Sequence, residues 1–141
     1  MRKIKVILIS LFCLLVIPKT VFAASGKINV SGTSTVVVGN NVTVTVTLSS
    51  STLIGSWEMS LNYDKNYLQL RSATSESNGI RMAASTATGV KSKSYTFTFK
   101  TLKKGSTSVS VGGYLAYAYA DLSEISLSSN SKKINIITQA E

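Results

Sequence analysis

The chain carries six acidic side chains, and they are its best candidates for general acid–base chemistry because it contains no histidine. They are Glu58, Asp64, Glu76, Asp121, Glu124 and Glu141. Glycoside hydrolysis needs two carboxyl groups across a cleft. Glu58 and Asp64 share one strand face, and strand rise would put them roughly 20 Å apart, which is too far. The only cysteine, Cys13, falls in a leader segment. The rest of the chain therefore has no thiol nucleophile, and neither a histidine nor a thiolate to bind a transition metal. The sequence therefore predicts a protein that is not an enzyme and needs no cofactor or metal.

The segment that positions Glu58 alternates strictly between apolar and polar residues. The apolar members are Trp57, Met59, Leu61 and Tyr63, and the polar members are Ser56, Glu58, Ser60, Asn62 and Asp64. Period two predicts a half-buried strand, because successive side chains point to opposite faces of a sheet. Residues 64–66 supply a turn that Asp64 is expected to cap. A calcium site at Asp64 would need several oxygen ligands close together, and the sequence does not show them. The polar row of this strand is free to meet a partner.

The first 23 residues read as a secretory signal peptide. Arg2, Lys3 and Lys5 precede an apolar run over 6–17, and small residues end at Ala23, where cleavage is expected. The run is short for a permanent membrane anchor, which is the alternative. We therefore expect a secreted, extracellular protein, with residues 24–141 forming one domain without disulfides.

Charge does not point to nucleic acid. The precursor has a net charge of +9, but loss of the leader's four basic residues leaves 11 basic and 6 acidic side chains, a net +5. The basic residues are scattered, whereas a nucleic-acid site would cluster them among exposed aromatics. We expect them to be solvated at strand edges and loop tips, where lysine also discourages aggregation.

The rest of residues 24–141 reads as short strands separated by turns. Valines alternate with threonines over 42–48, and aromatics alternate with polar residues over 95–100. Loops are expected at 49–51 and 85–89, and a tight turn at 39–41. No segment has a helical period long enough to trust. The pattern predicts an all-β protein, an antiparallel β-sandwich of eight or nine strands.

Several segments, in order, resemble a cohesin domain, the protein-binding module of bacterial cellulosome scaffolds. They are GNNVTVTVTL, IGSWEMSLNYDKNYLQL, YTFTFKTLKKGSTSVSV, LAYAYADLSEISL and KKINI. The resemblance extends from about residue 27 to 137. It implies a jelly-roll sandwich of about nine strands that binds a dockerin, a small calcium-loaded helical module carried by glycoside hydrolases, and hence a role in polysaccharide degradation.

The resemblance also implies where a dockerin would bind. Family contacts fall on outward polar residues flanking the position of Trp57, which are Ser56 and Glu58 here, and in the late loop, where Leu122 and Glu124 match. With Ser60 these residues are expected to form one partner-binding patch. Many cohesins place an amide at the position of Ser56 and an aspartate at that of Glu58. The segment 75–93 is shorter than in most cohesins, so no family contact is carried over to that segment.

Other interpretations stay open. Glu58 could be a solvated strand carboxylate, and Leu122 could pack onto the core. Trp57 is expected in the core but could instead form a sugar-stacking platform. A carbohydrate-binding module would need a coplanar strip of exposed aromatics, for which Tyr114 or Tyr119 offers a start. The chain could also be a structural spacer of a surface protein. We expect a monomer.

Overall fold

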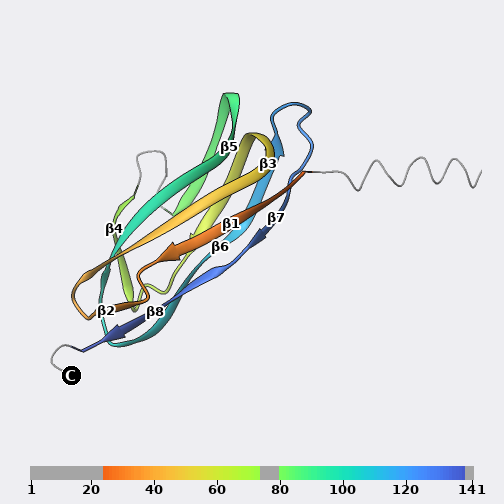
Figure 1. Ribbon diagram of the computed structural model, residues 1–141. Helices are drawn as coiled ribbons and strands as arrows, with labels where there is room; N and C mark the ends of the chain where they lie inside the picture. Colours follow the sequence, from red (N-terminus) through yellow and green to blue (C-terminus); the bar gives the residue numbers. More distant parts are fainter. Residues whose placement is uncertain (1–23, 74–79, 139–141) are drawn as a thin grey trace, which may run out of the picture.

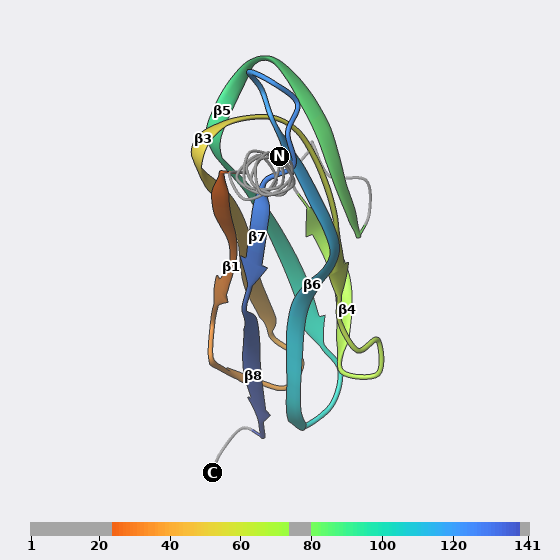
Figure 2. The ribbon, with the colours of Figure 1, turned by 90° about the vertical axis from the view of Figure 1, so that its right-hand side faces the viewer.

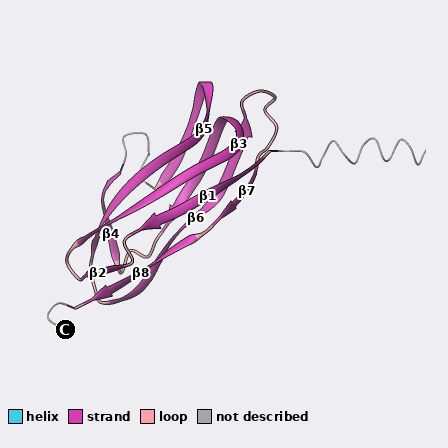
Figure 3. Cartoon of the chain, in the orientation of Figure 1, coloured by secondary structure: helices cyan, strands magenta, loops and turns pink. Residues whose placement is uncertain are grey.

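The computed structural model describes residues 24–73 and 80–138, and every regular element within them is a strand (Figure 3). The strands are β1 (Ser25–Gly32), β2 (Thr35–Val37), β3 (Asn41–Asn62), β4 (Leu68–Ala73), β5 (Arg81–Thr101), β6 (Gly105–Ala118), β7 (Ser126–Ser129) and β8 (Ser131–Ile137). In this part of the chain there is no helix with the length and hydrophobicity to cross a membrane. The expected signal peptide, residues 1–23, lies outside the described residues, as do Glu76 and Glu141.

The strands stack in two layers, and β3 and β5 are long enough to belong to both (Figures 1 and 2). In one layer the N-terminal half of β3 lies between β1 and the C-terminal half of β5, with β7 beyond β1 and β4 beyond β5. In the other, the C-terminal half of β3 lies between β6 and the N-terminal half of β5, with β8 and β2 beyond β6. The predicted β-sandwich is confirmed, with eight strands in the described residues.

Two expected loops are parts of long strands instead. The serines at 49–51 lie within β3, and residues 85–89 lie within β5. At these points both strands cross from one layer to the other, and the β3–β5 register shifts on each side of Ile54. Their polar composition marks the exposed bends at which the two long strands fold over from one layer to the other (Figures 1 and 2). Two of the pairings, β1 with β7 and β2 with β8, are parallel, so the sandwich is not purely antiparallel.

The crossing reverses which positions of β3 face the core. Even-numbered residues such as Val46 and Leu48 are buried before it, and odd-numbered residues such as Met59 and Leu61 after it. A bulge beside Gly55, where β3 uses two residues to pass one of β6, supplies the extra residue that this change of phase requires. A Cβ on Gly55 would lie 2.9 Å from the Cα of Tyr119, so the chains approach closely there. The bulge turns the polar row of β3 outward.

The core confirms the expected position of Trp57. Its side chain is 5% exposed and packs in the main hydrophobic cluster with Phe97, Phe99 and other apolar residues of both layers. Its indole Nε1 donates a hydrogen bond of 2.8 Å to the hydroxyl of Tyr95, which is also buried. Burial excludes Trp57 as a sugar-stacking platform.

Candidate functional site

The polar row of β3 lies in the middle of a sheet, with a neighbouring strand on each side. Along β3, Ser56 pairs with Ser85 and Tyr117, Glu58 with Ala83 and Leu115, and Ser60 with Arg81 and Gly112. We call the surface made by these three rows of paired residues the outer face. Ser56, Glu58 and Ser60 are each half-buried, because strands flank them while their side chains point away from the core. Five of its nine residues are serine, alanine or glycine.

Glu58 is not a free carboxylate. Nη2 of Arg81 donates to its Oε2 at 2.6 Å, and the two side chains are 53% and 43% exposed, for Arg81 and Glu58 respectively. An ion pair this exposed adds at most about 1 kcal/mol to stability. Its main effect is to hold both charged groups in place on the outer face, where a partner would meet a fixed pair of opposite charges.

The late loop, residues 119–125 between β6 and β7, reaches the same face through Tyr117. An isolated bridge pairs Tyr117 with Glu124, so Ser56, Tyr117 and Glu124 lie in one row across the sheet. Ser60 lies at the other end of the β3 row from Glu124. The structure thus places Ser56 and Glu124 in one row with Tyr117 between them, and Ser60 four residues further along β3, roughly 13 Å by strand rise.

Leu122 stands at the tip of the late loop and is 74% exposed, so it does not pack onto the core. It is the one non-glycine residue of the described chain with a positive φ, 61°. The turn is held by a hydrogen bond from its N–H to the Ala118 carbonyl (3.0 Å) and by another from the Ala118 N–H to the Ser123 carbonyl (2.8 Å). A left-handed conformation costs a leucine about 1–2 kcal/mol, so this loop holds an apolar side chain in solvent at some cost.

Asp121 fixes the start of this turn. Its Oδ1 accepts hydrogen bonds from the Ser123 hydroxyl at 2.7 Å and from the Ser123 N–H at 3.1 Å. These bonds, the hydroxyl's first, stabilise the charged form and lower the pKa of Asp121 below its ordinary value of 3.8. The carboxylate therefore acts as a turn-forming group.

The three large side chains of the outer face that the sequence does not predict there are Arg81, Leu115 and Tyr117. Leu115 and Tyr117 line an open depression of about 230 Å³ together with Ser56, Trp57 and Glu58. Their orientation depends on a bulge at Gly112–Gly113, where β6 uses three residues to pass two of β3. Gly113 has a φ of 59°, which favours glycine. The double glycine in the sequence was the available signal for that bulge.

The outer face and its surroundings offer no strip of exposed aromatics. Across the described residues, Tyr119 is the one aromatic that is largely exposed, at 41%, and its hydroxyl donates to the Ala87 carbonyl at 2.8 Å. Tyr114 and Tyr117 are half-buried. Within residues 24–73 and 80–138 no three acidic, histidine or cysteine side chains gather into a metal site. Asp64 caps its turn as predicted, with its Oδ1 accepting from the Asn66 N–H at 2.9 Å.

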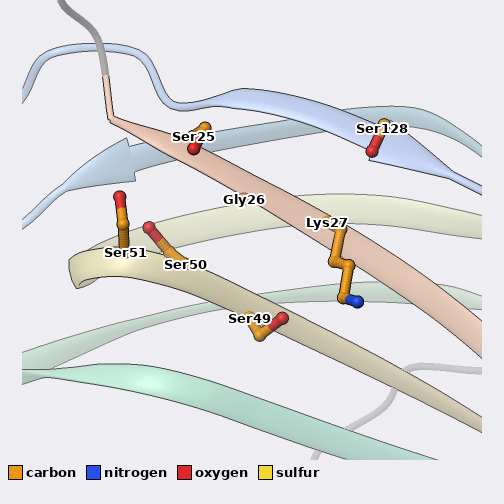
Figure 4. Close-up of a pocket in the computed structure, with 7 residues that line it drawn as sticks. All are labelled: Ser25, Gly26, Lys27, Ser49, Ser50, Ser51 and Ser128. Atoms are coloured by element: carbon orange, nitrogen blue, oxygen red, sulfur yellow. The ribbon is translucent and has the colours of Figure 1, made fainter.

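A larger open hollow of about 430 Å³ lies elsewhere, where β1, β3 and β7 meet (Figure 4). Its lining is Ser25, Gly26, Lys27, Ser49, Ser50, Ser51 and Ser128. Hydroxyl groups and one ammonium group line it, without a carboxylate to act as an acid or base. Size alone does not make it the functional site, and none of its lining residues belongs to the outer face.

Comparison with known families identifies the fold. The sequence model of the cohesin domain matches residues 26–136, which is most of the chain. The chain belongs to the cohesin family. This confirms the resemblance read from the sequence. A search of curated proteins found no match to this cohesin domain.

Several solved structures of similar fold are cohesins. A non-cellulosomal cohesin from the archaeon Archaeoglobus fulgidus has a TM-score of 0.67 at 16% identity, over 83% of this chain and 94% of that one. A type I cohesin from Clostridium thermocellum, solved in a cohesin–dockerin complex, has a TM-score of 0.65 at 12% identity, over 83% and 95%. A type II cohesin from the cellulosome of Acetivibrio cellulolyticus has a TM-score of 0.61 at 15% identity, over 85% and 100%. At these identities the likeness concerns the fold alone.

Proposed function

We propose that this cohesin domain is a secreted, non-catalytic module that binds a dockerin-type protein module through the outer face and the late loop. The observation that carries the proposal is Leu122, a leucine held 74% exposed in a left-handed conformation in the loop that Glu124 joins to that face through Tyr117. Backbone strain and an exposed large apolar side chain both cost stability, and their coincidence is typical of a binding residue. A family relative was solved in complex with a dockerin.

The outer face supplies the remaining contacts in this proposal. Ser56 and Ser60 offer hydroxyl groups on a flat surface, Leu115 is 36% exposed, and the Glu58–Arg81 pair presents both signs of charge. A partner can dock on such a surface without opening the sheet. Enzymes of polysaccharide degradation that carry dockerins are the class of partner we propose, with the complex formed outside the cell.

Calorimetric titration of the purified protein with dockerins from the same organism tests this function. Glu58→Lys should weaken binding by roughly 2 kcal/mol or more, the scale of a hot-spot residue, because it removes the carboxylate and leaves two cations side by side. Leu122→Ser should weaken binding by a similar amount, because it replaces the exposed apolar side chain with a polar one. Lys100→Glu, a charge reversal at an exposed position of the other layer, is the matched control and should bind normally.

The same proteins should be tested for retention on insoluble cellulose and for binding to soluble glycans. If Glu58→Lys and Leu122→Ser leave dockerin binding unchanged, the outer face and the late loop are not the binding surface. Glycan binding without dockerin binding would assign the domain to carbohydrate recognition, and binding to neither would favour a spacer.

A further inference from the structure

Among the described residues, the N-terminal part of β5 has a neighbouring strand on one side only and is an open sheet edge. Over residues 81–90 this strand pairs with β3 on one side, whereas β4 pairs with β5 only from Phe97 onward. In Figure 2 this green half of β5 runs along the outside of the sheet, with β3 and β6 on its inner side. The carbonyl of Ile80 accepts from the Leu61 N–H at 2.7 Å, so Ile80 directs its backbone groups to β3. Neighbouring residues of an antiparallel strand alternate in this respect, so Arg81, Ala83 and Ser85 direct theirs to the open side.

The bend that follows is closed by its own contacts. The Thr86 hydroxyl accepts hydrogen bonds from the N–H groups of Thr88 and Gly89, and the Ala87 carbonyl accepts from the Tyr119 hydroxyl. Two N–H groups and one carbonyl of this bend are thus engaged by neighbouring side chains. Within residues 81–90 the open edge is therefore Arg81–Ser85. Its three outward-directed residues, Arg81, Ala83 and Ser85, are all exposed.

Proteins usually protect such edges with charge, proline, bulges or shortness. The other outermost strands of the described chain follow this rule: β2 has three residues, β7 has four, and β4 carries Arg71. From Met82 to Val90, by contrast, β5 contains no charged residue and no proline. The one charge at its start, Arg81, is tied to Glu58 on the outer face.

We propose that this edge pairs with the same edge of a second copy of the chain, antiparallel about a two-fold axis at Ala83. In that register Ala83 faces Ala83, and Arg81 faces Ser85 of the other copy, so no like charges oppose each other. A register centred on Ser85 would instead place Arg81 against Gly89 in the closed bend. The small side chains at 83 and 85 let the two backbones approach, and the three outward-directed residues of each copy all find partners.

The resulting dimer would join the two outer faces into one surface, with Glu58 of each copy on the same side. About six backbone hydrogen bonds and a small buried area predict a weak association, with a dissociation constant on the order of 100 μM. The monomer expected from the sequence rested on strand patterns, which do not reveal which edges stay open. The dimer does not depend on dockerin binding.

Sedimentation equilibrium of the purified protein up to about 1 mM tests the proposal through charges placed at Ser85. Ser85→Glu puts a carboxylate opposite Arg81 of the other copy twice per dimer, and should tighten the dimer about two- to thirtyfold. Ser85→Lys puts like charges there twice, and should weaken it by a similar factor. Thr96→Glu and Thr96→Lys, at an exposed position in the other half of β5, are the matched controls and should leave association unchanged.

Circular dichroism and melting temperature should match the wild type in all four variants, since the substituted side chains are exposed. A wild type that stays monomeric up to about 1 mM would overturn the proposal. Dimerisation that ignores the sign of the charge at Ser85, or that responds equally at Thr96, would assign the contact to another surface and overturn it as well.

Discussion

Replacing Trp57 and Tyr95 by phenylalanine, singly and together, tests the buried hydrogen bond at the centre of the core. The indole N–H donates to the Tyr95 hydroxyl at 2.8 Å, with Trp57 5% exposed and Tyr95 fully buried. Trp57→Phe leaves the hydroxyl without its donor, and Tyr95→Phe leaves the indole N–H without its acceptor. Each unpaired group should cost about 1–3 kcal/mol. Trp57→Phe should cost more, because it also shrinks the ring.

The double variant leaves neither polar group unpaired, so it should be less destabilised than the sum of the two single variants. We expect an interaction energy of about 0.5–3 kcal/mol. Trp57→Ala should cost about 3–5 kcal/mol, the range for a buried aromatic. Urea unfolding followed by far-ultraviolet circular dichroism is the assay, since Trp57 is the only tryptophan and its removal abolishes a fluorescence signal. Effects that add to within about 0.3 kcal/mol, or a Trp57→Ala cost below about 1 kcal/mol, would refute the buried pair.

Three further expectations concern a close backbone approach, a turn and metal independence. Gly55→Ala should destabilise the fold by about 1–3 kcal/mol, because its Cβ would lie 2.9 Å from the Tyr119 Cα. Gly39→Ala, at a φ of 91° with open space around it, is the control and should cost only its backbone strain. Equal urea midpoints for the two variants would contradict this. An NMR pH titration should give Asp121 a pKa below 3.8, and Ser123→Ala should raise that pKa. The carboxylate's contribution to folding stability is present above pH 3.8 and is lost as the pH falls through the lowered pKa. A measured pKa at or above 3.8 would contradict the hydrogen bonds from Ser123 to Asp121. A chelator should leave the melting temperature of the domain unchanged, and a shift would reveal a structural metal ion.

The part of the fold that the sequence predicts is the part in which side-chain period and burial agree locally. The alternation around Trp57 and Met59 predicts both the strand and its buried face, and the turn capped by Asp64 follows from local chemistry. For the serine-rich stretch 49–51 the sequence predicts a loop, whereas it lies within β3. Polar composition does not distinguish a loop from a bulged strand that crosses between layers.

The candidate site is only partly predictable for a related reason. Ser56 and Glu58 could be placed on an outward face from strand period alone. Arg81 reaches Glu58 across 23 positions of sequence, and Leu115 and Tyr117 turn outward only because β6 bulges against β3. Pairings of this kind depend on tertiary contacts that the sequence pattern of one strand does not contain.

The central claim is that the outer face and the late loop form the dockerin-binding surface, and NMR mapping of backbone amides tests it most directly. On addition of a dockerin that binds, the account predicts the largest shifts at Ser56, Glu58, Leu115 and Leu122, with the C-terminal half of β5 little changed. Shifts concentrated on the layer of β1, β4 and β7, with the outer face unaffected, would contradict it.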